Sequence, residues 1–146
     1  MAHEYSNYAV SVGLRNVGSY QVSGHPWITG SLNMGDADTE HTVSFPYVTK
    51  NITVIASGTY GSTPGDGHSI KIHFNSNSDP GDVLDAAHFI TLDSDEDSMT
   101  FDVKCKEIFL TNVTAGAQFQ LFACLTNIPT DRMYTLTGSG LTDPSD

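Results

Sequence analysis

Apolar and polar residues alternate along several short stretches of the chain, which is the pattern of β-strands that bury one face. The clearest example is residues 69–74, where Ile70, Ile72 and Phe74 alternate with Lys71 and His73. This spacing predicts a half-buried strand. We expect the three apolar side chains to face the core, and Lys71 and His73 to face solvent.

Weaker forms of the same pattern predict further strands, separated by clusters of turn-forming residues. We expect strands at 42–45, 49–56, 88–92, 99–103 and 118–126, a short last strand at 133–137, and glycine-interrupted edge strands at 16–24 and 27–32. The expected turns and loops are 58–67, 75–81, 93–97 and 112–117. Residues 82–87 are predicted to form one or two helical turns capped by Asp82.

The alternation breaks its phase near the first cysteine. Apolar residues occupy odd positions from Met99 to Cys105, whereas Ile108 and Leu110 occupy even ones. A strand cannot do this on one face, so we expect a β-bulge within 104–107 or burial of both faces.

The two cysteines allow one geometric test of pairing. If residues 101–111 and 118–127 form a hairpin, Cys105 faces Cys124 within reach of a disulfide, but a bulge would break that register. A chain without an export signal more often keeps such thiols reduced, and we expect free cysteines.

These elements favour an all-β fold, an antiparallel β-sandwich or jelly roll in a single domain. Ile, Val and Thr supply 34 of the 146 residues, and β-branched side chains suit strands. We predict an N-terminal arm or edge strands at 1–35, a sandwich core at 36–138 and a loose tail at 139–146.

The charge balance excludes several classes of function. Lys and Arg number 6 against 17 Asp and Glu, so the chain carries −11. Binding of nucleic acid needs clustered cations, and no apolar run is long enough to span a membrane. The start of the chain lacks the pattern of a secretory signal. Eight carboxylates and no cation lie between Lys71 and Lys104, which predicts one strongly negative face.

Candidate ligand sites are few, and each has a structural alternative. Asp93, Asp95 and Asp97 have the spacing that begins a calcium loop, but the glycine of that loop is absent, so a hydrated acidic turn is favoured over a Ca²⁺ site. Trp27 with its neighbours Tyr20 and His25 would form an aromatic platform or cover one end of the sandwich.

No histidine has the spacing of a zinc site, and we expect the histidines to face outward from their strands. They are His3, His25, His41, His68, His73 and His88. Since no nucleophile–base signature is present either, the sequence predicts a non-enzymatic protein with no catalytic, cofactor-binding or metal-binding residues.

Five short segments spread over most of the chain carry a resemblance. They read VGSYQVSGHP at 17–26, FPYVTK at 45–50, KCKEI at 104–108, LTNIP at 125–129 and LTGSG at 136–140. The order of these segments resembles that in small virion structural proteins of tailed bacteriophages, especially those of marine phages. The resemblance implies a β-sandwich subunit displayed on the particle, such as a head decoration (cement) protein. It implies no active-site residues.

A role of this kind predicts particular contacts. We expect segments 16–32 and 127–141 to be arms that bind the major capsid protein or another virion protein by shape and β-edge contacts, while the acidic strip faces outward. Assembly in the host cytoplasm fits free cysteines, and a cyclic homo-oligomer such as a trimer fits the local symmetry of a capsid.

The alternative is a carbohydrate- or receptor-binding β-sandwich module. Trp27, Tyr47 or Tyr60 would stack on a sugar, and an acidic turn would hold Ca²⁺.

The arm hypothesis makes a direct prediction. Deletion of residues 1–24 should abolish binding to the particle and leave the core folded, because the predicted core begins later in the chain. Co-sedimentation with particles and circular dichroism measure the two effects. Retained binding would remove this arm from the account.

Overall fold

The computed structural model describes residues 13–21, 24–57, 69–77, 83–85, 87–93, 96–138 and 140–141. They form two four-stranded antiparallel sheets, which confirms the predicted all-β sandwich. In one sheet β1 (His25–Ser31), β8 (Gln118–Pro129), β3 (Tyr47–Ser57) and β6 (Ser98–Phe101) lie in that order. The other sheet contains β2 (Glu40–Ser44), β7 (Glu107–Asn112), β4 (Ile70–His73) and β5 (Ile90–Leu92). We call them the β8 sheet and the β7 sheet.

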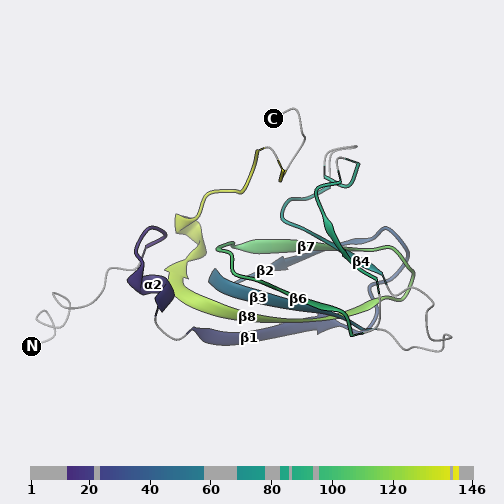
Figure 1. Cartoon of the computed structure of the whole chain (residues 1–146), viewed down its shortest axis with the longest axis horizontal. Coiled ribbons are helices and arrows are strands. Elements are labelled where there is room, and N and C mark those ends of the chain that lie inside the picture. Colours follow the sequence, from purple (N-terminus) through teal and green to yellow (C-terminus); the bar gives the residue numbers. More distant parts are fainter. Residues whose placement is uncertain are drawn as a thin grey trace, which may run out of the picture.

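The strand pairs are nested. β1 pairs with β8, β2 with β7, β3 with β6 and β4 with β5, all antiparallel. The chain therefore reverses direction between β4 and β5, and its two halves, β1–β4 and β5–β8, pair along their length as one long antiparallel ribbon. Successive parts of the ribbon alternate between the two sheets, and the β3–β8 and β4–β7 ladders join these parts (Figure 1).

The core lies between the sheets and is built from the alternating apolar residues that the sequence predicted. Buried side chains from both sheets form one cluster, and in β8 the predicted row of Phe119, Leu121, Ala123 and Leu125 faces it. Other members are Ile52 and Val54 of β3, Ile70 and Ile72 of β4, and Ile108 and Leu110 of β7. Met34 also belongs to this cluster, although it precedes the predicted start of the core.

The break in alternation does not come from a bulge within 104–107, and the alternative expectation, burial of both faces, holds for β7 from Ile108 onward. Phe101 ends β6 in the β8 sheet, and Ile108 lies in β7 of the other sheet. The chain crosses between sheets over 102–106, so the phase changes without a bulge in one strand. The hairpin that a disulfide would have required is not formed, because β7 and β8 belong to different sheets.

The two cysteines are consequently not opposite each other in any pair of strands. Cys105 is buried in the crossing, where its backbone N–H donates to Thr49 Oγ1 at 3.0 Å. Cys124 lies in β8 opposite Pro26 on one side and Asn51 on the other. Both thiols are free, as the sequence led us to expect.

Three local predictions are wrong for identifiable reasons. Residues 16–24 contain one helical turn, α2 (Gly18–Gln21), in place of a strand, and Asn16 Oδ1 accepts the N–H of Gly18 at 3.0 Å. After β8 the chain enters the 3₁₀ turn η1 (Thr130–Arg132), and no strand follows over 133–137.

The described residues of the next segment, 83–85 and 87–89, form hydrogen-bonded turns and no helix. The backbone N–H groups of Val83 and Leu84 are accepted by Asn77 Oδ1, at 3.1 and 2.9 Å, so the side chain that receives them comes from earlier in the chain than predicted. Asp82 and the expected loop at 58–67 lie outside the described residues.

Within β1, Gly30 marks a close approach of two backbones. A Cβ at this position would meet the carbonyl oxygen of Phe119 at 2.6 Å, which no side chain tolerates without movement.

Asn112 fixes the loops at one end of the sandwich, and its loss should be costly. The fully buried Asn112 amide donates to the carbonyls of Gly35, Asp36 and Thr114, and its Oδ1 accepts the N–H of Thr39.

We expect Asn112→Ala to lower the free energy of unfolding in urea by about 3 kcal/mol, because several backbone groups lose their partner. Asn127→Ala is the matched control, since exposed Asn127 makes a single side-chain contact with His25; it should cost less than about 1 kcal/mol. Equal losses in the two variants would contradict this role.

Candidate interaction surface

The two predicted arms meet at one end of the sandwich. The η1 turn lies beside the segment that precedes α2, and Arg132 lines the same open depression of about 800 Å³ as Gly13, Leu14, Arg15, Asn16 and Val17. Further along, His25 Nε2 and Asn127 Oδ1 are 2.7 Å apart. This contact links the start of β1 to the end of β8. Segments more than a hundred residues apart therefore form one surface (Figure 1).

Tyr20 and Tyr134 interact electrostatically at this end of the sandwich. The Tyr20 hydroxyl donates to the Leu14 carbonyl at 2.8 Å, and burial together with the neighbouring Tyr134 phenol raises the pKa of Tyr20. Tyr134 itself remains 59% exposed, and Val17 is 65% exposed. We call Arg15, Val17, Arg132 and Tyr134 the arm surface.

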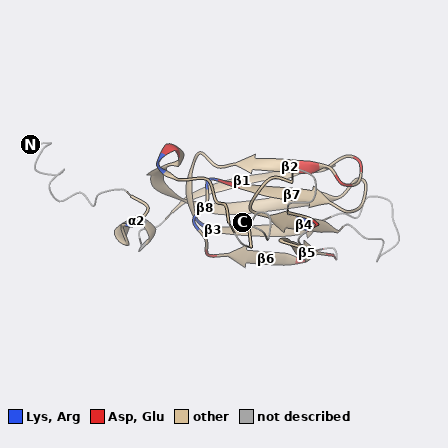
Figure 2. Ribbon diagram, turned by 90° about the horizontal axis from the view of Figure 1, so that it is seen from above, with Lys and Arg blue, Asp and Glu red and all other residues tan. Residues whose placement is uncertain are grey.

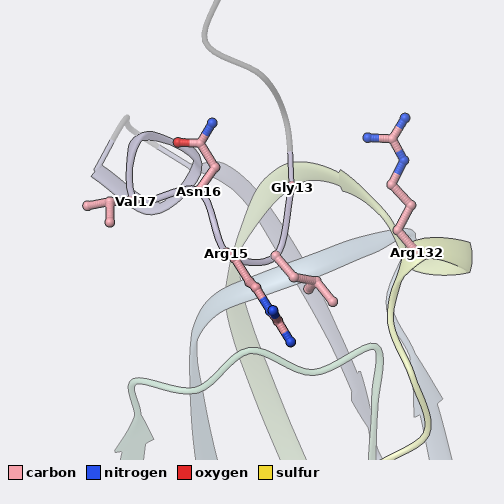
Figure 3. Close-up of a pocket in the computed structure, with 6 residues that line it drawn as sticks. Gly13, Arg15, Asn16, Val17 and Arg132 are labelled. Atoms are coloured by element: carbon pink, nitrogen blue, oxygen red, sulfur yellow. The ribbon is translucent and has the colours of Figure 1, made fainter.

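Both arginines of the chain belong to the arm surface. Figure 3 shows their side chains pointing away from each other, Arg15 and Arg132 on separate sides of the depression. They do not converge on one small anion. The arrangement instead offers separated cations and exposed apolar groups, which suits contact with an extended protein surface.

Cationic residues gather at this end of the molecule. Lys106 Nζ lies 3.4 Å from the Met133 carbonyl oxygen just after η1, and Lys104 lies in the same crossing. Lys50 is near the start of β3, whose first residue pairs with Pro129. The remaining cation, Lys71, lies over the Phe89 ring in the β7 sheet, with its Nζ 4.5 Å from the ring centroid.

Carboxylates gather at the opposite end. The loop before β2 carries Asp36 and Asp38, and the backbone N–H of Asp38 donates to the Asn112 carbonyl. The turn between β5 and β6 carries Asp93, Glu96 and Asp97; its Glu96 N–H donates to the Ala56 carbonyl near the end of β3. We call this end the acidic end. Figure 2 shows red segments at this end, while the blue segments near η1 and the start of β3 lie at the other end, where Asp131, Asp102 and Glu107 add further red ones.

This arrangement corrects the prediction of a single negative face. Asp102, a member of the predicted strip, follows β6 and lies at the end that carries Lys104 and Lys106. Asp85 is exposed on the connection between β4 and β5. Asp79, Asp82 and Asp95 lie outside the described residues.

The metal and aromatic candidates have different outcomes. Within the described ranges, no three His, Cys, Asp or Glu side chains gather as metal ligands, while Asp95 of the calcium-like turn falls outside them.

Trp27 packs edge-on against Phe45, with ring centroids 5.3 Å apart, and contacts the core cluster, which matches the structural alternative. Tyr60 is not among the described residues, whereas Tyr47 is 42% exposed and stacks beside His25.

His73 contradicts the expectation of outward-facing histidines. It lies on the outer side of the β7 sheet, yet it is fully buried, and Asn75 of the segment that follows β4 contacts its ring. Its ring stacks on Phe109, with centroids 5.9 Å apart and planes 11° apart. Nδ1 lies 2.7 Å from the Asn75 carbonyl oxygen and therefore carries the proton, so Nε2 accepts the Thr111 hydroxyl at 2.8 Å.

The same connection is tied down around His73. Asn75 Nδ2 donates to the Leu136 carbonyl, and the Glu40 carboxylate accepts Ser76 Oγ at 2.6 Å and the Asn77 N–H at 2.7 Å. The predicted half-buried strand at 69–74 is thus buried on both sides at His73. Sequence alternation gave no signal of this cover, since it comes from a segment folded back over the sheet.

Thiol chemistry is not favoured in the core. Burial raises the pKa of Cys105 to about 11, although a hydrogen bond from Thr49 opposes that rise. The thiol therefore stays protonated at neutral pH and is a poor nucleophile.

No protein-family model matches the chain, and a search of curated proteins also finds no match. Among the described residues, no helix has the length and apolar character needed to cross a membrane.

The burial of His73 predicts a pH dependence of stability. Burial lowers the pKa of His73 below 6.5, outweighing the Asn75 hydrogen bond and the Glu40 charge that raise it; Lys71 lowers it further. The unfolded chain therefore binds a proton more readily than the folded one. The contribution of His73 to the free energy of unfolding should be constant above pH 6.5. It should decrease as the pH drops below that value towards the pKa of His73 in the folded protein.

Urea midpoints measured across this range test the prediction. His73→Gln removes the titrating ring and should flatten the decline, although it lowers stability at neutral pH by losing the stacking on Phe109. An equal decline in wild type and variant would contradict the assignment to His73.

Proposed function

We propose that this chain is a non-enzymatic virion structural protein, a decoration subunit that adheres to the outside of a capsid. The observation that carries the proposal is the position of the arm surface. It joins the two segments expected to make contacts, exposes apolar side chains next to cations, and lies at the opposite end from the acidic end. A subunit with this layout binds at one end and presents the other to solvent.

The nested strand pairs support the same class of protein. We infer that the ribbon, with strand orders β1-β8-β3-β6 and β2-β7-β4-β5, is a jelly roll. This architecture is found in viral capsid and lectin domains. Adhesion by such a subunit needs shape and many small contacts and no catalytic group. The partner is the major capsid protein or another virion protein, and the place of assembly is the host cytoplasm.

The charges of the arm surface specify the partner further. Two arginines beside Val17 and Tyr134 favour a capsid surface with exposed carboxylates around an apolar patch. The acidic end, turned outward, keeps decorated particles from adhering to one another.

A carbohydrate-binding role is the second candidate, and the exposed Tyr47 beside His25 favours it. Stacking of a sugar on Tyr47 would make glycan binding sensitive to Tyr47→Ala. Loss of binding with a chelator would point to Ca²⁺ held by the 93–97 turn. A flat glycan screen with the full chain would remove this candidate.

The arm surface predicts which substitutions weaken capsid binding. Val17→Ser and Tyr134→Ser should each lower the affinity for particles stripped of this chain by about tenfold, because each loses an apolar contact worth roughly 1.4 kcal/mol. Val113→Ser is the matched control, since Val113 is 40% exposed near the acidic end. Pelleting of the full-length variants with particles measures the affinity.

The arginines add a salt test to this series. Binding should weaken as salt rises, and the double variant Arg15→Glu with Arg132→Glu should bind poorly at low salt. All these side chains are exposed or partly exposed, so the fold should survive, and circular dichroism checks it. The proposal fails if Val113→Ser binds as poorly as Val17→Ser and Tyr134→Ser, or if no arm variant affects binding.

A further inference from the structure

His73 connects parts of the chain that are far apart in sequence. It ends β4, and its ring contacts Asn75, which follows that strand, and Thr111 of β7. Asn75 in turn reaches the C-terminal part of the chain, because its Nδ2 donates to the Leu136 carbonyl. One imidazole thus joins β7, the segment after β4 and the segment after η1 through a series of hydrogen bonds.

This series requires the neutral form of the ring. Because Nδ1 donates its proton to the Asn75 carbonyl at 2.7 Å, Nε2 is left to accept the Thr111 hydroxyl at 2.8 Å. A proton on Nε2 would displace the hydroxyl proton that points at it, and would place a positive charge on a fully buried side chain. The ring therefore has to reach water before it binds a second proton readily.

The charged groups around the ring do not offset its burial. β7 presents Phe109 and Thr111 to the ring, and neither is charged. Glu40 of β2 favours a charged ring, but its carboxylate is engaged by residues 76–77. Lys71, two residues before the ring on β4, opposes a charge. Burial is the largest influence, and it lowers the pKa of the ring below its ordinary value of 6.5.

The segment held by the ring is attached separately from the core. We call residues 75–77 the latch segment. Besides the contact with the ring, it is fastened by the Glu40 carboxylate, which accepts one hydroxyl at 2.6 Å and one backbone N–H at 2.7 Å. Phe74, just before it, packs edge-on against Phe101 of β6 and against the core cluster. The latch segment can therefore leave the β7 sheet while Phe74 keeps the chain attached to the core.

Together these contacts form a device that responds to acid. We propose that proton uptake by His73 releases the latch segment and its bond to Leu136 while the two sheets stay paired. Once the segment is released, the ring reaches water and binds a proton with its ordinary pKa of 6.5. Acid therefore favours the open state below pH 6.5 and has no effect through this ring above it.

The release differs from unfolding of the whole domain in what it costs. Opening breaks a few polar contacts that water replaces, whereas unfolding also exposes the core between the sheets. Since one proton is involved, the opening constant should rise by at most about tenfold for each unit of pH below 6.5. The latch does not depend on a role in virions.

Native-state hydrogen exchange of the full chain, measured by NMR in low concentrations of urea, tests the latch. The amides of Ser76 and Asn77, which donate to Asn75 Oδ1 and to Glu40, should lose protection in acid after correction for the intrinsic rate. Urea should hardly change this loss, because local opening exposes little surface. Amides of the β3–β8 ladder should be more protected and should lose protection steeply with urea.

Two histidine variants make the test specific. His73→Gln keeps an N–H for the Asn75 carbonyl and an oxygen for the Thr111 hydroxyl but does not titrate, so its latch amides should lose the response to acid. His41→Gln is the matched control and should keep the response, since His41 Nε2 likewise lies 2.8 Å from a backbone carbonyl oxygen, that of Met34. Circular dichroism shows whether each variant is folded.

Titration of the wild-type His73 ring by NMR tests the latch independently of the variants. The ring should titrate below pH 6.5, over the range in which the amides of Ser76 and Asn77 lose protection. The latch is contradicted if these amides exchange no faster in acid, or only with the urea dependence of the core. A ring that titrates at 6.5 or above, a folded His73→Gln that still responds to acid, or a folded His41→Gln that does not would also overturn it.

Discussion

The ladder between β3 and β8 is the interaction on which the rest of the molecule depends. These are the two longest strands, and they form the centre of their sheet, with β1 and β6 attached outside them. Their pairing places Ile52 opposite Ala123 and Val54 opposite Leu121, and this row is one wall of the core. Near Thr49 the register shifts, and there Thr49 Oγ1 donates to the Val103 carbonyl and accepts the Cys105 N–H. The ladder thus also holds the crossing to the other sheet.

The same ladder separates the arm surface from the acidic end. β8 has 12 residues, which at about 3.3 Å each span roughly 40 Å. At its beginning lies the acidic end, and at its end η1 brings Arg132 to the arm surface. Because this distance is several Debye lengths at physiological salt, the cations at one end are little neutralised by the carboxylates at the other. A rigid strand pair therefore allows a chain of strong net negative charge to keep both arginines and most of its lysines away from the acidic end.

Sequence patterns predicted the strands well because alternation reports burial on a single face, as in Phe119 to Leu125. They did not predict how the strands divide between sheets. The change of phase between Cys105 and Ile108 is compatible with a bulge, two buried faces or a crossing, and only the long-range pairing distinguishes these. Burial of His73 arises from a segment folded over it, and the network of Asn112 joins loops far apart in sequence. Of the candidate surface, the sequence predicted the two arms, but not that they meet beside both arginines.

Antibody labelling of intact tailed-phage particles that encode this chain tests the central claim most directly. One antibody should recognise the loop at residues 36–40 of the acidic end, and another the segment at 13–17 of the arm surface. The account predicts that the first decorates the heads, and that the second binds only after the subunit is released. Intact heads without label from the first antibody, or heads labelled equally by both, would contradict a subunit that holds the capsid by its arm surface.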